Sequence, residues 1–147
     1  MIVYTCGTFD CFHAGHVNFL RQCSVLGDVV VSLNTDEFIE EYKGRPPIMK
    51  YDERKKVLEA CSYVTKVVKN VGGADSKKAI LKVKPDIIAI DTGWAVLDYY
   101  KQMGFTQKWI DENDMVLVYL PRTQDISTTE IRKRLHEASN CNTDSTK

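Results

Sequence analysis

Residues 2–6, IVYTC, and residues 7–16, GTFDCFHAGH, determine the fold that the sequence predicts. The first run is β-branched and aromatic and is closed by a glycine, as in a short strand. After His16 the apolar residues recur at helical spacing until Gly27, so a helix follows the second run. A turn that leaves a strand and opens a helix presents free backbone N–H groups and the positive end of the helix dipole. Both favour a bound phosphate.

The rest of the chain alternates in the same way. Further strands are expected over residues 28–34, 63–69, 86–90 and 115–120, and helices over 51–62, 76–83 and 127–137. The run 28–34 is almost entirely apolar, which is typical of a parallel strand covered on both faces. The sequence therefore predicts one α/β domain, residues 1–137, with a Rossmann-like five-stranded parallel sheet and helices on both faces. The polar tail, residues 138–147, is expected to be disordered.

This topology also predicts where an active site would lie. Right-handed crossovers put it at the carboxyl ends of the strands, where the strand order reverses. The loops 6–16, 34–50 and 91–94 are expected to gather there, together with residues 121–128 after the fifth strand.

The bulk composition excludes several classes of partner. The 147 residues carry 20 Lys and Arg against 20 Asp and Glu, a formal net charge of zero. That balance argues against a broad nucleic-acid or anionic-membrane surface, although a local cationic pocket stays possible. No apolar run approaches the roughly 20 residues that span a bilayer, and the first residues lack a secretory pattern. The five cysteines have no metal-ligand spacing and are expected to be reduced and mostly buried. We therefore expect a cytoplasmic protein.

Two histidines carry the chemistry of the first motif. His13 and His16 are three residues apart at a helix start, so they share one face and can donate hydrogen bonds to triphosphate oxygens. Gly7 allows a tight turn, and Gly15 removes a side chain where a nucleotide could pack closely. The alternatives are a solvated helix start or a metal pair. We expect no protein-held metal, because only one other histidine exists and the cysteines are wrongly spaced.

Residues 122–129, RTQDISTT, form a second motif between the fifth strand and the last helix. Ser127 or Thr128 can cap that helix, with Glu130 in its first turn. The same helix start, with its hydroxyls and free N–H groups, is also a seat for phosphate. Arg122 adds a permanent, fork-shaped charge suited to phosphate oxygens.

GTFD followed by HAGH in the first motif, and RTQDISTT in the second, resemble the signatures of the cytidylyltransferase-like nucleotidyltransferases, most closely the glycerol-3-phosphate cytidylyltransferases. The resemblance extends over residues 1 to about 135. It implies transfer of CMP from CTP to a small phosphorylated alcohol, with glycerol 3-phosphate as the first expectation, and release of pyrophosphate. It also implies a Mg²⁺ ion bound with the triphosphate, and a homodimer.

The resemblance further assigns roles to individual residues. The expected catalytic residues are His13, His16, Lys43 and Arg122. The expected nucleotide-binding residues are Gly7, Thr8, Phe9, Asp10, Gly15, Arg54, Asp91, Trp94, Ile126, Ser127 and Thr128. Lys77 is a weaker substrate-binding candidate, for which a surface charge on a helix is the simpler explanation. Seen without the resemblance, Lys43 is a solvated charge in an irregular loop, and Asp10 could either assist Mg²⁺ or hold its own loop.

One segment departs from the family pattern and leaves the acceptor open. Residues 91–94 read DTGW where the family usually has Gly-[Asp or Ser]-Asp-Trp, so Gly93 stands in place of an acid. Residues 97–109 resemble those of extended relatives with a Tyr-containing helix, and their aromatic residues are expected in the core or a dimer surface. An aromatic cage for a quaternary amine could use Trp94, Tyr99, Tyr100 and Trp109.

Three alternative functions follow from these observations. The first is an FAD-synthetase-like adenylyltransferase that uses ATP. The second is a CTP-dependent enzyme whose acceptor is phosphocholine, phosphoethanolamine or a phosphonate. The third is a non-catalytic nucleotide-binding module.

Overall fold

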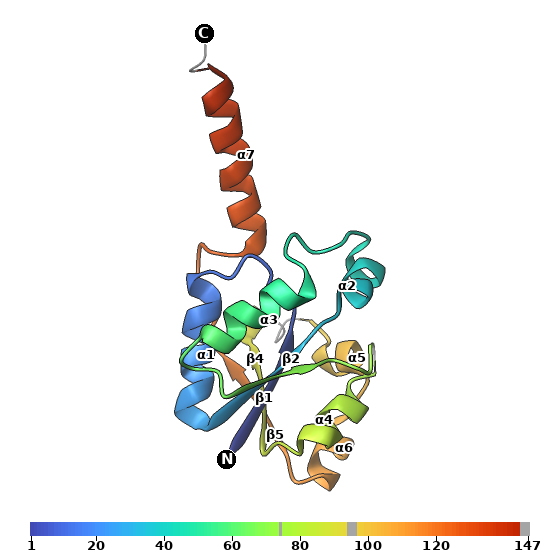
Figure 1. Ribbon diagram of the computed structural model, residues 1–147. Coiled ribbons are helices and arrows are strands. Elements are labelled where there is room, and N and C mark those ends of the chain that lie inside the picture. The colour runs from blue at the N-terminus through green and yellow to red at the C-terminus, as the bar shows by residue number, and fades with distance from the viewer. Residues whose placement is uncertain (74, 94–96, 145–147) are drawn as a thin grey trace.

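A twisted, five-stranded parallel sheet forms the centre of the computed structural model, which describes residues 1–73, 75–93 and 97–144 (Figure 1). The strands are β1 (Ile2–Gly7), β2 (Asp28–Leu33), β3 (Lys66–Lys69), β4 (Ile87–Asp91) and β5 (Val116–Leu120). Their order is β3-β2-β1-β4-β5, and every neighbouring pair is parallel. The predicted fold class is therefore confirmed.

Seven helices are described: α1 (Ala14–Leu26), α2 (Asp36–Lys43), α3 (Tyr51–Ala60), α4 (Lys77–Val83), α5 (Tyr99–Met103), α6 (Gln107–Glu112) and α7 (Thr128–Asp144). Successive residues of β1 point to opposite faces of the sheet, as the strand period requires. Val3 packs into a core with residues of α1 and α3, whereas Tyr4 packs into a second core with residues of α4, α5 and α6. Both faces of the sheet are thus covered by helices.

The strand order changes direction at β1, which lies between β2 and β4. From β1 the chain moves first toward β3 and then crosses back to β4 and β5. The loops that leave the carboxyl ends of β1 and β4 consequently run apart and open a crevice between them, the position where open α/β sheets bind ligands.

Helix α2 occupies part of a segment for which the sequence predicted only a loop. Thr35 caps its start by accepting a hydrogen bond from the Phe38 N–H at 3.1 Å. Gly44 ends it in the left-handed conformation, with φ of 73°. Lys43 therefore extends from a helix end and not from an irregular loop, and its approach to the site is better fixed than expected.

The end of the chain also differs from the expectation. Helix α7 continues to Asp144, whereas the sequence predicted a disordered tail from residue 138. It leaves the body of the molecule at the carboxyl edge of the sheet and extends away from it (Figure 1). An ion pair between Arg134 and Glu130, at 3.5 Å and one helical turn apart, supports the helix. None of the described helices is long and apolar enough to cross a membrane.

Candidate functional site

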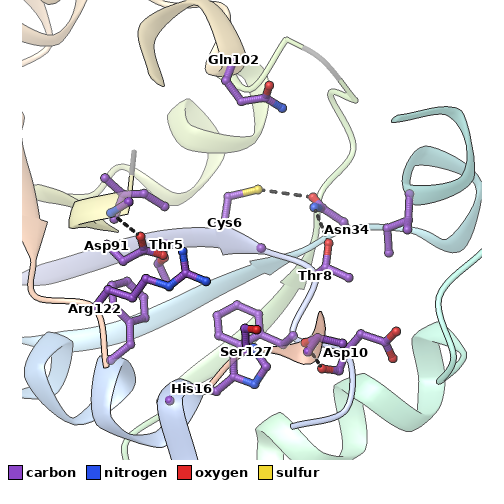
Figure 2. Close-up of a pocket in the computed structure, with 18 of the residues that line it drawn as sticks. Thr5, Cys6, Thr8, Asp10, His16, Asn34, Asp91, Gln102, Arg122 and Ser127 are labelled. Carbon is purple, nitrogen blue, oxygen red and sulfur yellow. Dashed lines mark hydrogen bonds between the residues drawn. The ribbon is translucent and has the colours of Figure 1, made fainter. Parts of the chain in front are cut away.

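A pocket of about 480 Å³ opens at the carboxyl ends of β1, β2 and β4; we call it the central pocket (Figure 2). It brings together most of the predicted site residues from segments far apart in sequence. Those that line it are Gly7, Thr8, Phe9, Asp10, His13, Gly15, His16, Lys43, Asp91, Arg122, Ile126, Ser127 and Thr128. Arg54 and Lys77 do not line it, and Trp94 lies outside the described residues.

His13 and His16 form a reciprocal cap at the start of α1. Nδ1 of His13 accepts a hydrogen bond from the Gly15 N–H at 3.1 Å, and Nδ1 of His16 accepts one from the His13 N–H at 3.2 Å. A ring nitrogen that accepts a hydrogen bond carries no proton, so each neutral imidazole holds its proton on Nε2. The cap therefore fixes the tautomer and leaves both Nε2–H groups to donate to a ligand.

The surroundings keep both rings neutral. Burial, and to a smaller extent the neighbouring His13, lower the pKa of His16 to about 3, while the carboxylate of Asp10 acts in the opposite direction. The pKa of His13 is also lowered, first by burial and then by the charge of Arg122. The two rings stack with their centroids 3.8 Å apart. Two neutral donors packed this closely suit an anionic ligand, because one oxygen-rich group can accept from both.

Both motifs contain backbone in the sparsely populated left-handed region. Phe9 and Cys11 in the first motif have φ of 50°, and Asp125 in the second has φ of 62°. Such residues cost about 1–3 kcal/mol each and concentrate at functional sites.

Gly15 is constrained by the space around it, because a Cβ atom at this position would lie 2.9 Å from Cε1 of His13. A glycine at this position is what allows His13 to fold back over the helix start.

Asp10 connects three segments and has little capacity left for a metal. Its carboxylate is almost fully buried and accepts the N–H groups of Ile48 at 2.8 Å and Met49 at 2.9 Å. Arg132 of α7 lies 3.5 Å from Oδ2, and the Thr128 hydroxyl donates to the Asp10 carbonyl at 2.9 Å. Of the two roles considered for this residue, these contacts favour that of holding the loop.

Arg54 lies behind the pocket and connects the segments that form its walls. Its guanidinium donates to the carbonyls of Thr8 at 2.8 Å, Asn34 at 2.9 Å and Met49 at 2.9 Å, and pairs with Asp36 at 2.7 Å. The side chain is 0% exposed. Four of its five N–H groups donate to protein atoms. Arg54 does not line the pocket that the resemblance associated it with.

The start of α7 forms the opposite wall. Ser127 accepts the Glu130 N–H at 3.0 Å and so caps the helix, as the sequence predicted. Arg122 follows β5, and its own N–H donates to the Thr92 hydroxyl at 3.2 Å. Its guanidinium points toward the middle of the pocket (Figure 2). A cation and a helix start face the histidines, which is an arrangement suited to a chain of phosphates.

Lys43 supplies a second cation from the other side of the pocket. Its pKa is lowered, chiefly by partial burial and then by the charges of Arg45 and Arg132, while Asp10 acts in the opposite direction. Excess positive charge around a lysine is relieved when an anion binds. This end of the pocket is thus prepared for a negatively charged group.

The sequence analysis did not identify a third wall of the pocket, which consists of neutral polar groups. Cys6 and Asn70 both bond to Oδ1 of Asn34, at 3.4 and 2.9 Å, and Asn34 in turn donates to the Thr8 hydroxyl at 3.3 Å. Gln102 of α5 lies across the pocket from Cys6 (Figure 2). One signal was available: Asn34 directly follows β2, and polar residues at the carboxyl end of a parallel strand are candidates for ligand contact.

The aromatic residues of α5 and α6 belong mainly to the core. Tyr99 is 1% exposed and lines the inner side of the pocket, but Tyr100 and Trp109 pack around Phe105 on the far face of the sheet and do not line it. The expectation that they contribute to the core is confirmed. The described aromatic residues of this segment therefore do not converge into a cage.

Comparisons with known proteins agree with this geometry. Residues 4–134 match the family described as cytidylyltransferase-like. Glycerol-3-phosphate cytidylyltransferase of Staphylococcus aureus is 32% identical over 136 residues, which cover 91% of this chain and 94% of that protein. FAD synthase of Pyrococcus horikoshii is 45% identical over 85 residues, a match that spans only 57% of either protein.

A solved structure supports the fold alone. The lipopolysaccharide core biosynthesis protein of Thermoplasma volcanium superposes with a TM-score of 0.67 at 24% identity, over 84% of this chain and 96% of that one. The family match spans nearly the whole chain and includes both motifs that meet in the central pocket. This chain therefore belongs to the cytidylyltransferase-like family of nucleotidyltransferases.

Proposed function

We propose that the protein transfers CMP from CTP to the phosphate of a small phosphorylated alcohol and releases pyrophosphate. One observation carries the proposal: His13 and His16 are fixed as neutral Nε2–H donors in the same pocket as Arg122, Lys43 and the start of α7. That set provides donors and positive charge for a triphosphate and for a second anion beside it. Glycerol 3-phosphate is the first candidate acceptor, because the relative that is named for it matches nearly end to end.

The reaction needs no base. A phosphate oxygen of the acceptor is already anionic and attacks the α-phosphorus of CTP. A new P–O bond joins the acceptor phosphate to the α-phosphate, while the bond from the α-phosphorus to the oxygen bridging the β-phosphate breaks. The electron pair of that bond leaves with pyrophosphate. Catalysis then depends on holding the reactants in line and on stabilising charge as it moves onto the leaving group.

Each wall of the pocket has a role in this reaction. His13 and His16 donate to oxygens of the phosphates, where a preorganised donor typically contributes about 10²–10³-fold in rate. Arg122 and the capped start of α7 hold the leaving pyrophosphate. Lys43, on the other side, neutralises the repulsion between the acceptor phosphate and the α-phosphate.

We also propose that Mg²⁺ enters with the triphosphate. The described residues contain no group of three His, Cys, Asp or Glu side chains that could hold a metal ion, and the carboxylate of Asp10 is engaged by backbone N–H groups. This fits a hard cation that is held by phosphate oxygens and water, for which the protein supplies few ligands. When bound, the ion would neutralise charge on the phosphates.

An ATP-dependent enzyme is the second candidate. The 45% identity to an FAD synthase over 85 residues favours it, although that match covers only 57% of the chain. The family resemblance further implies a homodimer, and the balanced charge of the sequence supports a cytoplasmic protein without nucleic-acid or membrane partners. Light scattering coupled to size-exclusion chromatography measures the oligomeric state directly.

A pyrophosphate-release screen tests the function. CTP and ATP, each with Mg²⁺, are combined with glycerol 3-phosphate, phosphocholine, phosphoethanolamine, a phosphonate and FMN. We expect turnover with CTP and a phosphorylated alcohol, and a rate lower by about 10²-fold or more in the His16→Ala variant at the same enzyme concentration. Turnover only with ATP and FMN would favour the second candidate. Tight CTP binding without pyrophosphate release under any condition would indicate a non-catalytic module.

A further inference from the structure

The neutral wall of the central pocket keeps hydrogen-bonding positions that no described residue fills. It consists of Cys6, Asn34 and Asn70, with Gln102 of α5 across the pocket from Cys6 (Figure 2). Nδ2 of Asn34 carries two hydrogens, and one of them goes to the Thr8 hydroxyl at 3.3 Å. The side-chain amide of Gln102 makes no hydrogen bond to a described residue, either through its oxygen or through its nitrogen. The wall can therefore offer both donors and acceptors to a ligand.

Asn70 supplies the observation that points to a ligand. The residue is 5% exposed and lines the pocket. Its Nδ2 donates to Oδ1 of Asn34 at 2.9 Å and to Sγ of Cys6 at 3.4 Å. Its Oδ1 is buried and has no hydrogen-bond partner among the residues that the structure describes. A buried amide oxygen without a donor is destabilising, so a hydroxyl group that donates to it would remove that cost.

The neutral wall contains no charged side chain. In the described part of the chain, the acids that line the pocket are Asp10 and Asp91. Asp10 is engaged by backbone N–H groups. Asp91 ends β4, its Oδ1 accepts the Gly93 N–H at 2.8 Å, and its side chain lies beside Arg122, on the side of the pocket opposite Asn34 (Figure 2). A cationic group that packs against the neutral wall would therefore lack a carboxylate partner there.

The described aromatic residues beside the wall do not form a cage for a cation either. Phe38 and Tyr42 of α2 line the pocket, but they stack on each other with their centroids 6.1 Å apart and an angle of 10° between the rings. Two parallel rings on one helix cannot surround a quaternary amine, which needs ring faces on several sides. Lys43 adds a positive charge to the same pocket and repels a second cation. The surroundings of the wall thus disfavour a ligand with an ammonium group.

The arrangement of the pocket indicates which substrate meets the wall. In the proposed reaction, Arg122 and the start of α7 hold the leaving pyrophosphate, and Lys43 meets the acceptor phosphate. Lys43 ends α2, which follows β2, and the neutral wall lies at the ends of β1, β2 and β3. The attacking and leaving oxygens lie in line on opposite sides of the α-phosphorus. The acceptor is therefore the substrate that lies next to Asn70 and Gln102.

We propose that Asn34, Asn70 and Gln102 form hydrogen bonds with hydroxyl groups of the acceptor, which is the phosphate ester of a neutral polyol and not of an amino alcohol. The inference rests on the proposed function, which supplies the acceptor phosphate. A hydroxyl group is both donor and acceptor, so it can pair with the amide oxygen of Asn70 and with the amide nitrogen of Asn34. These residues then determine acceptor specificity.

Matched acceptors test the inference. Pyrophosphate release is measured at saturating CTP with Mg²⁺, using glycerol 3-phosphate, sorbitol 6-phosphate, propyl phosphate and phosphoethanolamine. Propyl phosphate has the carbon chain of glycerol 3-phosphate without its hydroxyl groups, and phosphoethanolamine carries an ammonium group. For the better of the two polyol phosphates we expect a kcat/KM at least about 10-fold above that of propyl phosphate or phosphoethanolamine, because an acceptor without hydroxyl groups leaves buried polar groups of the protein unpaired.

Variants of the wall test the residues themselves. Gln102→Met and Asn70→Leu each remove one amide and keep a side chain of similar size. Each should lower the preference for the polyol phosphate over propyl phosphate by about 5-fold or more, and should leave the KM for CTP within about 2-fold of the wild-type value. Gln102→Glu should raise the use of phosphoethanolamine relative to the polyol phosphate by about 3-fold or more, because it adds a carboxylate partner for the ammonium group. Gln107→Met, at an exposed position of α6 outside the pocket, is the matched control and should leave every ratio unchanged.

Two results would overturn the inference while cytidylyl transfer itself stands. One is wild-type turnover of propyl phosphate or phosphoethanolamine as efficient as that of the better polyol phosphate. The other is an unchanged acceptor preference in both Gln102→Met and Asn70→Leu. If the wild-type protein releases no pyrophosphate from CTP with any of the acceptors, the proposed function fails and the inference fails with it.

Discussion

Replacement of Arg54 by Met separates a structural arginine from a nucleotide-binding one. The substitution keeps an unbranched side chain but removes the guanidinium, which leaves three backbone carbonyls and the carboxylate of Asp36 without their donor. Removal of one partner of a buried ion pair costs about 3–5 kcal/mol. Asp36 is 35% exposed and can regain water, so we expect a value near the lower end. About 3 kcal/mol is a large part of the roughly 5–15 kcal/mol that stabilises a typical domain.

Urea unfolding followed by circular dichroism measures the loss. For a chain of this size, about 3 kcal/mol corresponds to a melting temperature lower by roughly 6–12 °C. Arg21→Met, at an exposed position of α1, is the matched control and should change the free energy of unfolding by less than about 0.5 kcal/mol. If Arg54→Met were as stable as this control while the KM for CTP rose more than 10-fold, Arg54 would be a nucleotide ligand and the structural argument would be wrong.

Three further predictions concern the histidine cap. His16→Ala should lower kcat by about 10²-fold or more without unfolding the protein, because one preorganised donor is lost; near-normal turnover would contradict the assignment. Gly15→Ala should lower kcat because its Cβ would displace the His13 ring, and a crystal structure of the variant would show whether that ring has moved. The neutral state of His16 is favoured in the fold, so its contribution to stability is complete above its unfolded pKa of about 6.5 and is lost as the pH falls toward the folded value of about 3. Across that window wild-type stability should decline faster with acidification than that of His16→Asn, by at most about 1.4 kcal/mol per pH unit; equal slopes would mean that the folded pKa is not lowered.

Hydrophobic periodicity was sufficient to predict the sheet, because fully covered parallel strands leave apolar runs that few other elements produce. The two motifs were recognisable for a related reason: each is a local strand-to-helix turn with its own capping chemistry. The sequence predicted a cap at Ser127 or Thr128, and the structure shows that it is Ser127. Helix α2 was missed although Thr35 and Gly44 mark its ends, because the charged, proline-containing residues 44–47 suggested a loop throughout.

What the sequence did not reveal depends on contacts between distant segments. The role of Arg54 is set largely by the carbonyls of Thr8 and Asn34, which lie 46 and 20 residues away along the chain and cannot be identified from its neighbours in sequence. The same is true of the neutral wall, where Cys6, Asn34 and Asn70 come from the ends of three adjacent strands. Sequence analysis did identify the departure at residues 91–94. Only the structure links Gly93 to the position of the Asp91 carboxylate.

The contacts of Asp10 affect the order in which parts of the protein fold during synthesis. Thr128 and Arg132 lie 118 and 122 residues away along the chain from the aspartate that they contact, and Asn18 meets Thr123 across 105 residues. Contacts of such long range form late, because a large loop must close before they yield any stabilisation. While the chain is on the ribosome, β1, α1 and β2 can assemble early, but the turn between β1 and α1 cannot make its contacts with α7 until that helix has been synthesised. A chain whose synthesis stops before residue 132 could therefore form much of the sheet but would lack a complete site.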